Sequence, residues 1–113
     1  MSRRDLTGAV DFAVLDRATG GDDTVAEEVL GLFVEQAALW SRLLDAPDAR
    51  IDACHTIRGA AASLGAHELE AACAAAEADP SDRRTDAVRD ALDRALGDVA
   101  AWRHELMLRS LKG

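Results

Sequence analysis

Apolar residues recur at intervals of three and four positions over two long stretches of this chain. The first stretch carries them at Val25, Val29, Leu32 or Phe33, Trp40, and Leu43 or Leu44. Charged residues stand between them, so a helix over this stretch would have one apolar and one charged side. The stretch from Val88 to Leu106 repeats the pattern. Such segments bury their apolar sides against one another, which favours an all-α fold.

Five segments of the chain are predicted to be helical. They run from Asp11 to about Ala18, from a cap at Asp22, Asp23 or Thr24 to about Leu44, from about Asp48 to Leu64, from His67 to about Ala78, and from about Arg84 to Leu111. Glycine and proline punctuate them, and Asp48 is expected to cap the third. Because the connections are short, the last four are predicted to form an antiparallel up-and-down four-helix bundle, with the first as a short extra N-terminal helix.

The composition limits the class of protein. A length of 113 residues suits one domain, and we expect a single domain over residues 1–113. A formal charge of −8 opposes binding to nucleic acid or to an acidic membrane surface. No apolar run approaches the roughly 20 residues that span a bilayer, and no apolar segment of a signal peptide follows Met1-Ser2-Arg3-Arg4. We therefore expect a cytoplasmic protein in which Cys54 and Cys73 are reduced, buried thiols.

His55 stands in the segment His55-Thr56-Ile57-Arg58-Gly59, which carries the chemistry of the chain. On a helix, Arg58, Gly59 and Ala62 fall on the same side as His55, whereas Ile57 falls on the opposite side. The imidazole is therefore expected to face solvent among small neighbours. Much of an imidazole is unprotonated near pH 7 and can attack a phosphoryl group, and a guanidinium can bridge two phosphate oxygens.

Other interpretations of these residues stay open. Asp52 and His55 have the i, i+3 carboxylate–histidine spacing of metal sites in helical bundles, but the matching residues of other helices are missing. Leu30, Phe33 and Ile51 are either plain core residues or part of an apolar rim around His55 on which a partner docks. His67 and His104 lack a comparable setting, and we interpret them as ordinary surface or capping residues.

This motif resembles that of the histidine-containing phosphotransfer (HPt) domains of phosphorelays. His55, Arg58, Gly59 and Gly65 match the family's histidine, the basic residue three positions on, the neighbouring glycine and the second glycine. Leu69 and Glu77 match the leucine and the acidic or amide residue that commonly follow. Arg58 stands where lysine is more frequent, and Ala76 where leucine is usual. The likeness covers roughly residues 10–108.

The resemblance implies a covalent phosphoryl carrier and not an enzyme. A receiver-domain aspartate would phosphorylate His55, which would pass the group to a second receiver aspartate. Glu77 would accept a hydrogen bond from one imidazole nitrogen, and the small Gly59 and Ala62 would let the partner approach closely. The partners would be receiver domains of response regulators and of a hybrid histidine kinase, which would hold the Mg²⁺; this chain would need no cofactor and would be a monomer.

The chain has no glycine-rich phosphate loop followed by lysine, so it is not expected to bind ATP or to phosphorylate itself. The phosphoryl group would have to come from another protein. One alternative hypothesis is a helical adapter or inhibitor that docks on a kinase or receiver domain through the same surface without carrying phosphate.

Overall fold

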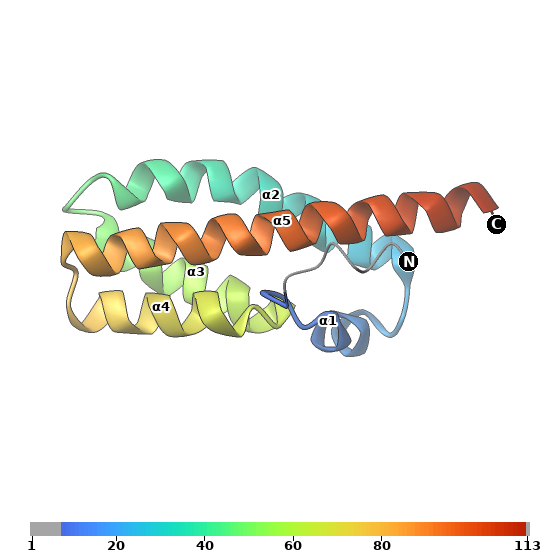
Figure 1. Ribbon diagram of the computed structural model, residues 1–113, viewed down its shortest axis with the longest axis horizontal. Coiled ribbons are helices and arrows are strands. Elements are labelled where there is room, and N and C mark those ends of the chain that lie inside the picture. The colour runs from blue at the N-terminus through green and yellow to red at the C-terminus, as the bar shows by residue number, and fades with distance from the viewer. Residues whose placement is uncertain (1–7, 113) are drawn as a thin grey trace.

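Five helices make up the part of the chain, residues 8–112, that the computed structural model describes (Figure 1). They are α1 (Phe12–Thr19), α2 (Asp23–Leu44), α3 (Arg50–Leu64), α4 (His67–Ala78) and α5 (Asp82–Lys112). These residues include no strand, and none of their helices has the length and apolar composition needed to cross a membrane. Met1 to Arg4, whose sequence predicts no signal peptide, lie outside the described residues.

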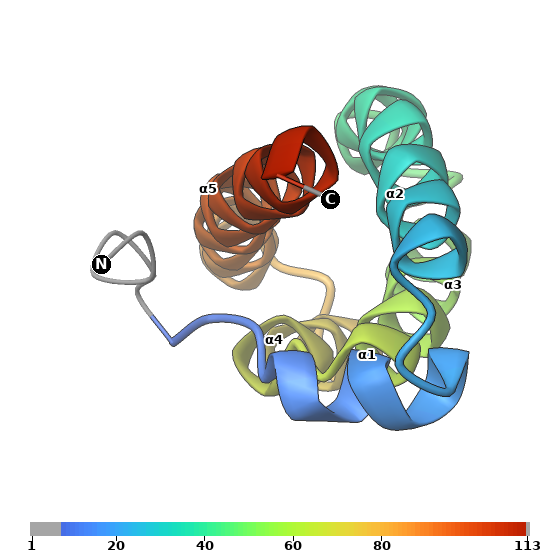
Figure 2. The ribbon, with the colours of Figure 1, turned by 90° about the vertical axis from the view of Figure 1, so that its right-hand side faces the viewer.

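The four long helices form the predicted antiparallel bundle. Helix α2 packs against α3 and α5, and α4 also packs against α3 and α5, so α2 and α4 lie diagonally opposite each other. The short α1 lies beside the end of the bundle at which α2 begins and α5 ends (Figures 1 and 2). The predicted four-helix bundle with a short N-terminal helix is therefore confirmed.

The core comes from one stripe of each long helix. In α2 the buried residues are Ala26, Leu30, Phe33, Ala37, Trp40 and Leu44, and in α5 they include Val88, Leu92, Ala95, Val99, Trp102 and Leu106. The aromatic residues supply its bulk, as predicted. The ring of Phe33 meets Trp40 edge-on at 5.6 Å between centroids, and Phe12 of α1 stacks on Trp102 at 4.6 Å. These contacts tie α1 to the same core as α5.

Helices α3 and α4 make the most extensive contact between any two helices of the bundle. The side chains that they bury are mostly small, including Ala53, Cys54, Cys73 and Ala76. Small side chains allow two helix axes to approach closely, as the alanine-rich sequence predicts. The close approach brings polar residues at the edge of α4 within reach of α3.

Two helix starts differ from the prediction by two residues, and that of α1 differs by one. Helix α3 begins at Arg50, and Asp48 does not cap it, because the preceding turn is closed by backbone bonds and by Arg50 Nε donating to the Leu44 carbonyl at 3.0 Å. Helix α5 begins two residues before Arg84. Ser81 explains this earlier start, since its side-chain oxygen accepts the Arg84 N–H and its carbonyl accepts the Thr85 N–H.

Candidate functional site

His55 lies on the side of α3 that faces solvent, as the helical spacing predicts. Its side chain is 71% exposed, whereas Cys54 and Ile57 have no exposed surface. Gly59 and Ala62 are exposed on the same side. A Cβ atom built on Gly59 would meet no other atom within 4 Å, so the space beside the imidazole is open.

One carboxylate on α4 contacts both the imidazole and the guanidinium. Oε1 of Glu77 lies 3.0 Å from Nδ1 of His55, and Oε2 lies 2.9 Å from Nη1 of Arg58. The Glu77 side chain is only 18% exposed, against 42% for Arg58. Oε2 of Glu77 is closed off from solvent, and its contact with Arg58 is an ion pair without hydrogen-bond alignment. Arg58 therefore balances the charge of this oxygen electrostatically.

The contact between Glu77 and His55 depends on how closely the two helices pack. Cys73 lies one turn before Glu77 and is fully buried in the α3–α4 contact, as is Cys54, the residue before His55. Small residues at this contact leave the next turn of α4 beside His55. The sequence alone does not show whether Glu77 reaches His55. In the structure the two side chains are in contact.

The two thiols under the site stay protonated. Burial raises the pKa of the Cys73 thiol to about 12, with the Cys54 thiol and the negative charge of Glu77 adding to the effect. Burial, followed by the charge of Glu77, also raises the pKa of Cys54. Because the thiolate is the reactive form of cysteine, neither residue competes with His55 as a nucleophile. Both are free thiols, as predicted.

The apolar surface near His55 differs from the expected one. Leu30 is fully buried, so its assignment to the docking surface is wrong: it belongs to the core stripe of α2. Phe33 is 4% exposed and is mainly a core residue, whereas Ile51 is 46% exposed. The large apolar residue that α2 does expose here is Leu32, at 55%.

A shallow groove of about 190 Å³ between α2 and α3, the α2–α3 groove, begins next to Gly59. Its lining residues are Val29, Leu32, Phe33, Gln36, Trp40, Ala60, Ser63 and Leu64. Ser63 follows Gly59 by one helical turn and donates a hydrogen bond to the Gly59 carbonyl at 3.2 Å. Gly59 in turn follows His55 by one turn, so one side of α3 carries the imidazole, the open glycine and the edge of the groove.

Sequence reasoning missed Leu32 and Gln36 as candidate surface residues. The sequence contains a pattern that could have identified them. A second row of α2 has the same three- and four-residue spacing as the buried row and consists of Val25, Val29, Leu32, Gln36, Leu39 and Leu43. Its position directly beside the core row marks it as a surface continuous with α3.

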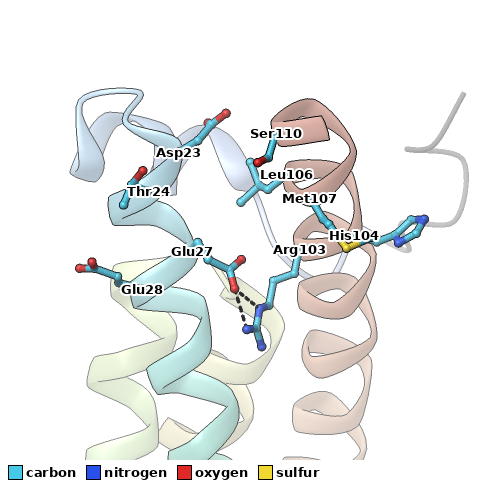
Figure 3. A pocket seen from close by; sticks show the side chains of 9 residues that line it. All are labelled: Asp23, Thr24, Glu27, Glu28, Arg103, His104, Leu106, Met107 and Ser110. Carbon is cyan, nitrogen blue, oxygen red and sulfur yellow. Dashed lines mark hydrogen bonds and ion pairs between the residues drawn. The ribbon is translucent and has the colours of Figure 1, made fainter. Parts of the chain in front are cut away.

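A larger hollow, of about 600 Å³, lies between the first turns of α2 and the last turns of α5 (Figure 3). Glu27 and Arg103 form an ion pair across it, with 2.6 Å between Oε1 and Nη2. The side-chain hydrogen bond to Glu27 raises the pKa of Arg103, which strengthens its hold on the proton. None of the candidate site residues lines this hollow, so its size alone does not connect it with the chemistry of His55.

The remaining histidines have different surroundings. Nδ1 of His67 lies 3.8 Å from the half-exposed Glu70 of the same helix, and no arginine pairs with that glutamate among the described residues. Residues 8–112 hold no cluster of three or more His, Cys, Asp or Glu side chains able to bind a metal ion, and Asp52 is exposed beside His55 without such partners.

Comparisons with known proteins agree with this geometry. The family model described as Hpt domain matches residues 27–102. Among solved structures, the chain is similar to the crystal structure of the histidine phosphotransferase ShpA from Caulobacter crescentus, with 48% sequence identity and a TM-score of 0.83. The alignment covers 92% of this chain and 99% of that one. A comparison with curated protein sequences found no match.

Proposed function

Because the chain belongs to the Hpt domain family, and so to the phosphotransfer proteins of two-component signalling, we propose that His55 carries a phosphoryl group between the aspartates of two receiver domains. The observation that supports this most directly is the exposed imidazole of His55, whose Nδ1 is held by the enclosed carboxylate of Glu77 while its Nε2 side is open. We further propose that the protein acts as a monomer in the cytoplasm.

In the proposed reaction, Nε2 of His55 attacks the phosphorus of a receiver aspartyl phosphate. The N–P bond forms as the P–O bond to the aspartate breaks, and the aspartate leaves as a free carboxylate. The proton on Nδ1 stays in place, next to Oε1 of Glu77, which stabilises the positive charge that develops on the ring. Transfer to the second receiver reverses these bond changes, so both steps use the same groups.

Arg58 would stabilise the phosphoryl group as it moves. Phosphoryl transfer places negative charge on three equatorial oxygens, and catalysis of such a step is largely positioning and electrostatic stabilisation. The guanidinium stands one turn from His55, is 42% exposed and contacts Glu77 through one nitrogen. Its remaining N–H groups have the fork geometry that suits phosphate oxygens.

The receiver domain would dock over Gly59, Ala62 and the α2–α3 groove. The open space at Gly59 lets the partner's phosphoaspartate come within transfer distance of the imidazole. An apolar side chain of the receiver would enter the groove beside Leu32, and Ile51 would contribute at the other side of His55. The receiver would supply the Mg²⁺, and this chain would need neither a cofactor nor an ATP site of its own.

Transfer from isolated receiver domains tests the proposal. The wild type, His55→Gln and His67→Gln are incubated with the phosphorylated receivers of the source organism, and acid-labile protein phosphate is measured. The wild type and His67→Gln should gain phosphate, whereas His55→Gln should gain none. His67 is a matched control because it is also exposed and also faces a glutamate. Equal labelling of His55→Gln would refute the assignment.

A cellular measurement separates the carrier from the adapter. A carrier with His55→Ala should lose the signalling output, because no covalent acceptor remains. An adapter or inhibitor that only docks on a receiver or kinase would keep its effect in this variant. Output equal to that of the wild type would therefore contradict phosphoryl transfer through this chain.

A further inference from the structure

Both carboxylate oxygens of Glu77 are in use. Oε1 faces Nδ1 of His55 and Oε2 faces Nη1 of Arg58, so the side chain lies between the two groups that the proposed reaction needs. Within residues 8–112 no other cation forms an ion pair with Glu77. Its Oε2 is closed off from solvent, so water does not replace Arg58 as a partner of that oxygen.

We propose that Arg58, besides being a partner for the phosphoryl group, acts through position 77 on His55: it determines which kind of side chain there can hold the imidazole proton on Nδ1. By occupying Oε2, it makes a carboxylate necessary at position 77. The inference deepens the proposed function, on which it rests for the choice of Nε2 as the phosphoryl acceptor.

The reason is the number of acceptors that the side chain at position 77 offers. An ionised carboxylate has only acceptor sites, on two oxygens, so Oε2 faces the Arg58 cation while Oε1 accepts from Nδ1. Nδ1 of a neutral His55 must then carry the proton, and Nε2 keeps the lone pair that attacks phosphorus. Glu77 thus selects the reactive tautomer because both of its oxygens are acceptors.

A glutamine in this place would have one acceptor and one donor. The guanidinium of Arg58 is charged and competes better for the single amide oxygen than a neutral imidazole does. The amide NH₂ would then face Nδ1 of His55 and donate to it. The proton would move to Nε2, the nitrogen that has to be free for phosphoryl transfer.

A second substitution should rescue the first. In Glu77→Gln, Arg58 takes the amide oxygen and the tautomer inverts. In the double variant Glu77→Gln/Arg58→Ala the oxygen is released, turns to Nδ1, and restores the proton there. Arg58→Ala alone keeps the carboxylate and so keeps the tautomer of the wild type. The second substitution repairs the first, a pattern that independent structural damage does not produce.

The experiment is ¹⁵N NMR of the imidazole nitrogens in histidine-labelled protein, at a pH where titration of the same signals shows the His55 ring to be neutral. The wild type and Arg58→Ala should show an unprotonated Nε2. Glu77→Gln should lose that signal, and the double variant should regain it. Glu70→Gln, beside His67, is the matched control and should leave the His55 signals unchanged.

Two results would overturn the inference. One is a wild-type tautomer in Glu77→Gln, which would mean that Arg58 does not claim the amide oxygen. The other is a double variant that remains protonated on Nε2. Failure of receiver domains to phosphorylate the wild type would instead contradict the proposed function, and the tautomer measurements would still decide the role of Arg58 because they need no partner protein.

Discussion

Gly65 ends α3 with a φ of +78°, a left-handed conformation, and its backbone meets the start of α1. The Asp11 N–H donates to the Gly65 carbonyl at 2.9 Å. A Cβ atom at position 65 would lie 2.5 Å from the Asp11 carbonyl oxygen and 2.9 Å from Cβ of Val14. Gly65→Ala should therefore strain the backbone and also force α1 away from α3.

Gly20 separates the two effects. It ends α1 with a φ of +62°, but a Cβ there would meet nothing within 4 Å. A left-handed L-residue costs about 1–2 kcal/mol, which is the whole expected loss for Gly20→Ala. Overpacking a well-filled contact adds about 1–3 kcal/mol, so Gly65→Ala should lose about 2–5 kcal/mol of unfolding free energy.

Urea unfolding followed by circular dichroism measures both losses. Gly65→Ala should be less stable than Gly20→Ala by about 1–3 kcal/mol, the contribution of the α1 contact alone. In thermal unfolding each kcal/mol corresponds to a fall in Tm of about 4 °C for a chain of this size. If Gly65→Ala were no less stable than Gly20→Ala, the close contact of α1 with this turn would not limit stability and the reasoning would be wrong.

Three further predictions concern the site. Arg58→Ala should slow phosphoryl transfer from a receiver by about a hundredfold and, because it leaves the enclosed Oε2 of Glu77 without its cation, lower the unfolding free energy by about 1–3 kcal/mol; a wild-type transfer rate at a temperature where the variant is folded would contradict this. Gly59→Leu should stay folded and weaken receiver binding in a titration, whereas Gly97→Leu, on an exposed position of α5, should bind as the wild type does. The raised pKa of Cys73 lets the folded state keep a proton that the unfolded chain loses above about pH 9. The free energy of unfolding should therefore fall as the pH rises above that value, by up to about 1.4 kcal/mol per pH unit for this thiol. Unfolding curves of Cys73→Ala should show a smaller fall, and an equal one would exclude this thiol as the cause.

The helices were predictable because their apolar spacing depends only on neighbouring residues. Helix α4 matches its predicted bounds, and the others agree to within two residues. The differences arise where a turn uses bonds that propensity does not reveal, such as Arg50 reaching back to the Leu44 carbonyl. Helix starts of this kind depend on side chains that fold back on the preceding turn, which a periodic pattern does not encode.

The orientation of α2 was harder to predict than its extent. Two neighbouring rows of this helix are mostly apolar at the same spacing, one containing Leu30 and the other Leu32. They lie about 100° apart around the helix axis, and either could have faced the core. The structure buries the row of Leu30, because Phe33 and Trp40 share it and fill the bundle, and leaves the row of Leu32 beside α3.

The orientation of His55 and the position of Arg58 follow from one helix, so the sequence predicts them. Glu77 belongs to another helix, and its contact with His55 depends on an interhelical distance that small residues such as Ala76 set. A leucine, usual at that position in the resembling family, would add volume within this contact and change that distance.

Asp98, away from the site, is another residue whose surroundings depend on contacts between elements and could not be predicted from its own helix. The pattern of α5 suggests one more exposed charge, but Asp98 is fully buried and its Oδ2 accepts the Val10 N–H at 3.2 Å. Together with the bond from Asp11 to Gly65, this contact fixes the residues before α1 to both α5 and the α3–α4 turn. Neither contact includes His55, Arg58 or Glu77. Changes that loosen α1 should consequently lower stability and leave the paired contacts of Glu77 in place, which is why stability and transfer can be measured as separate properties of this bundle.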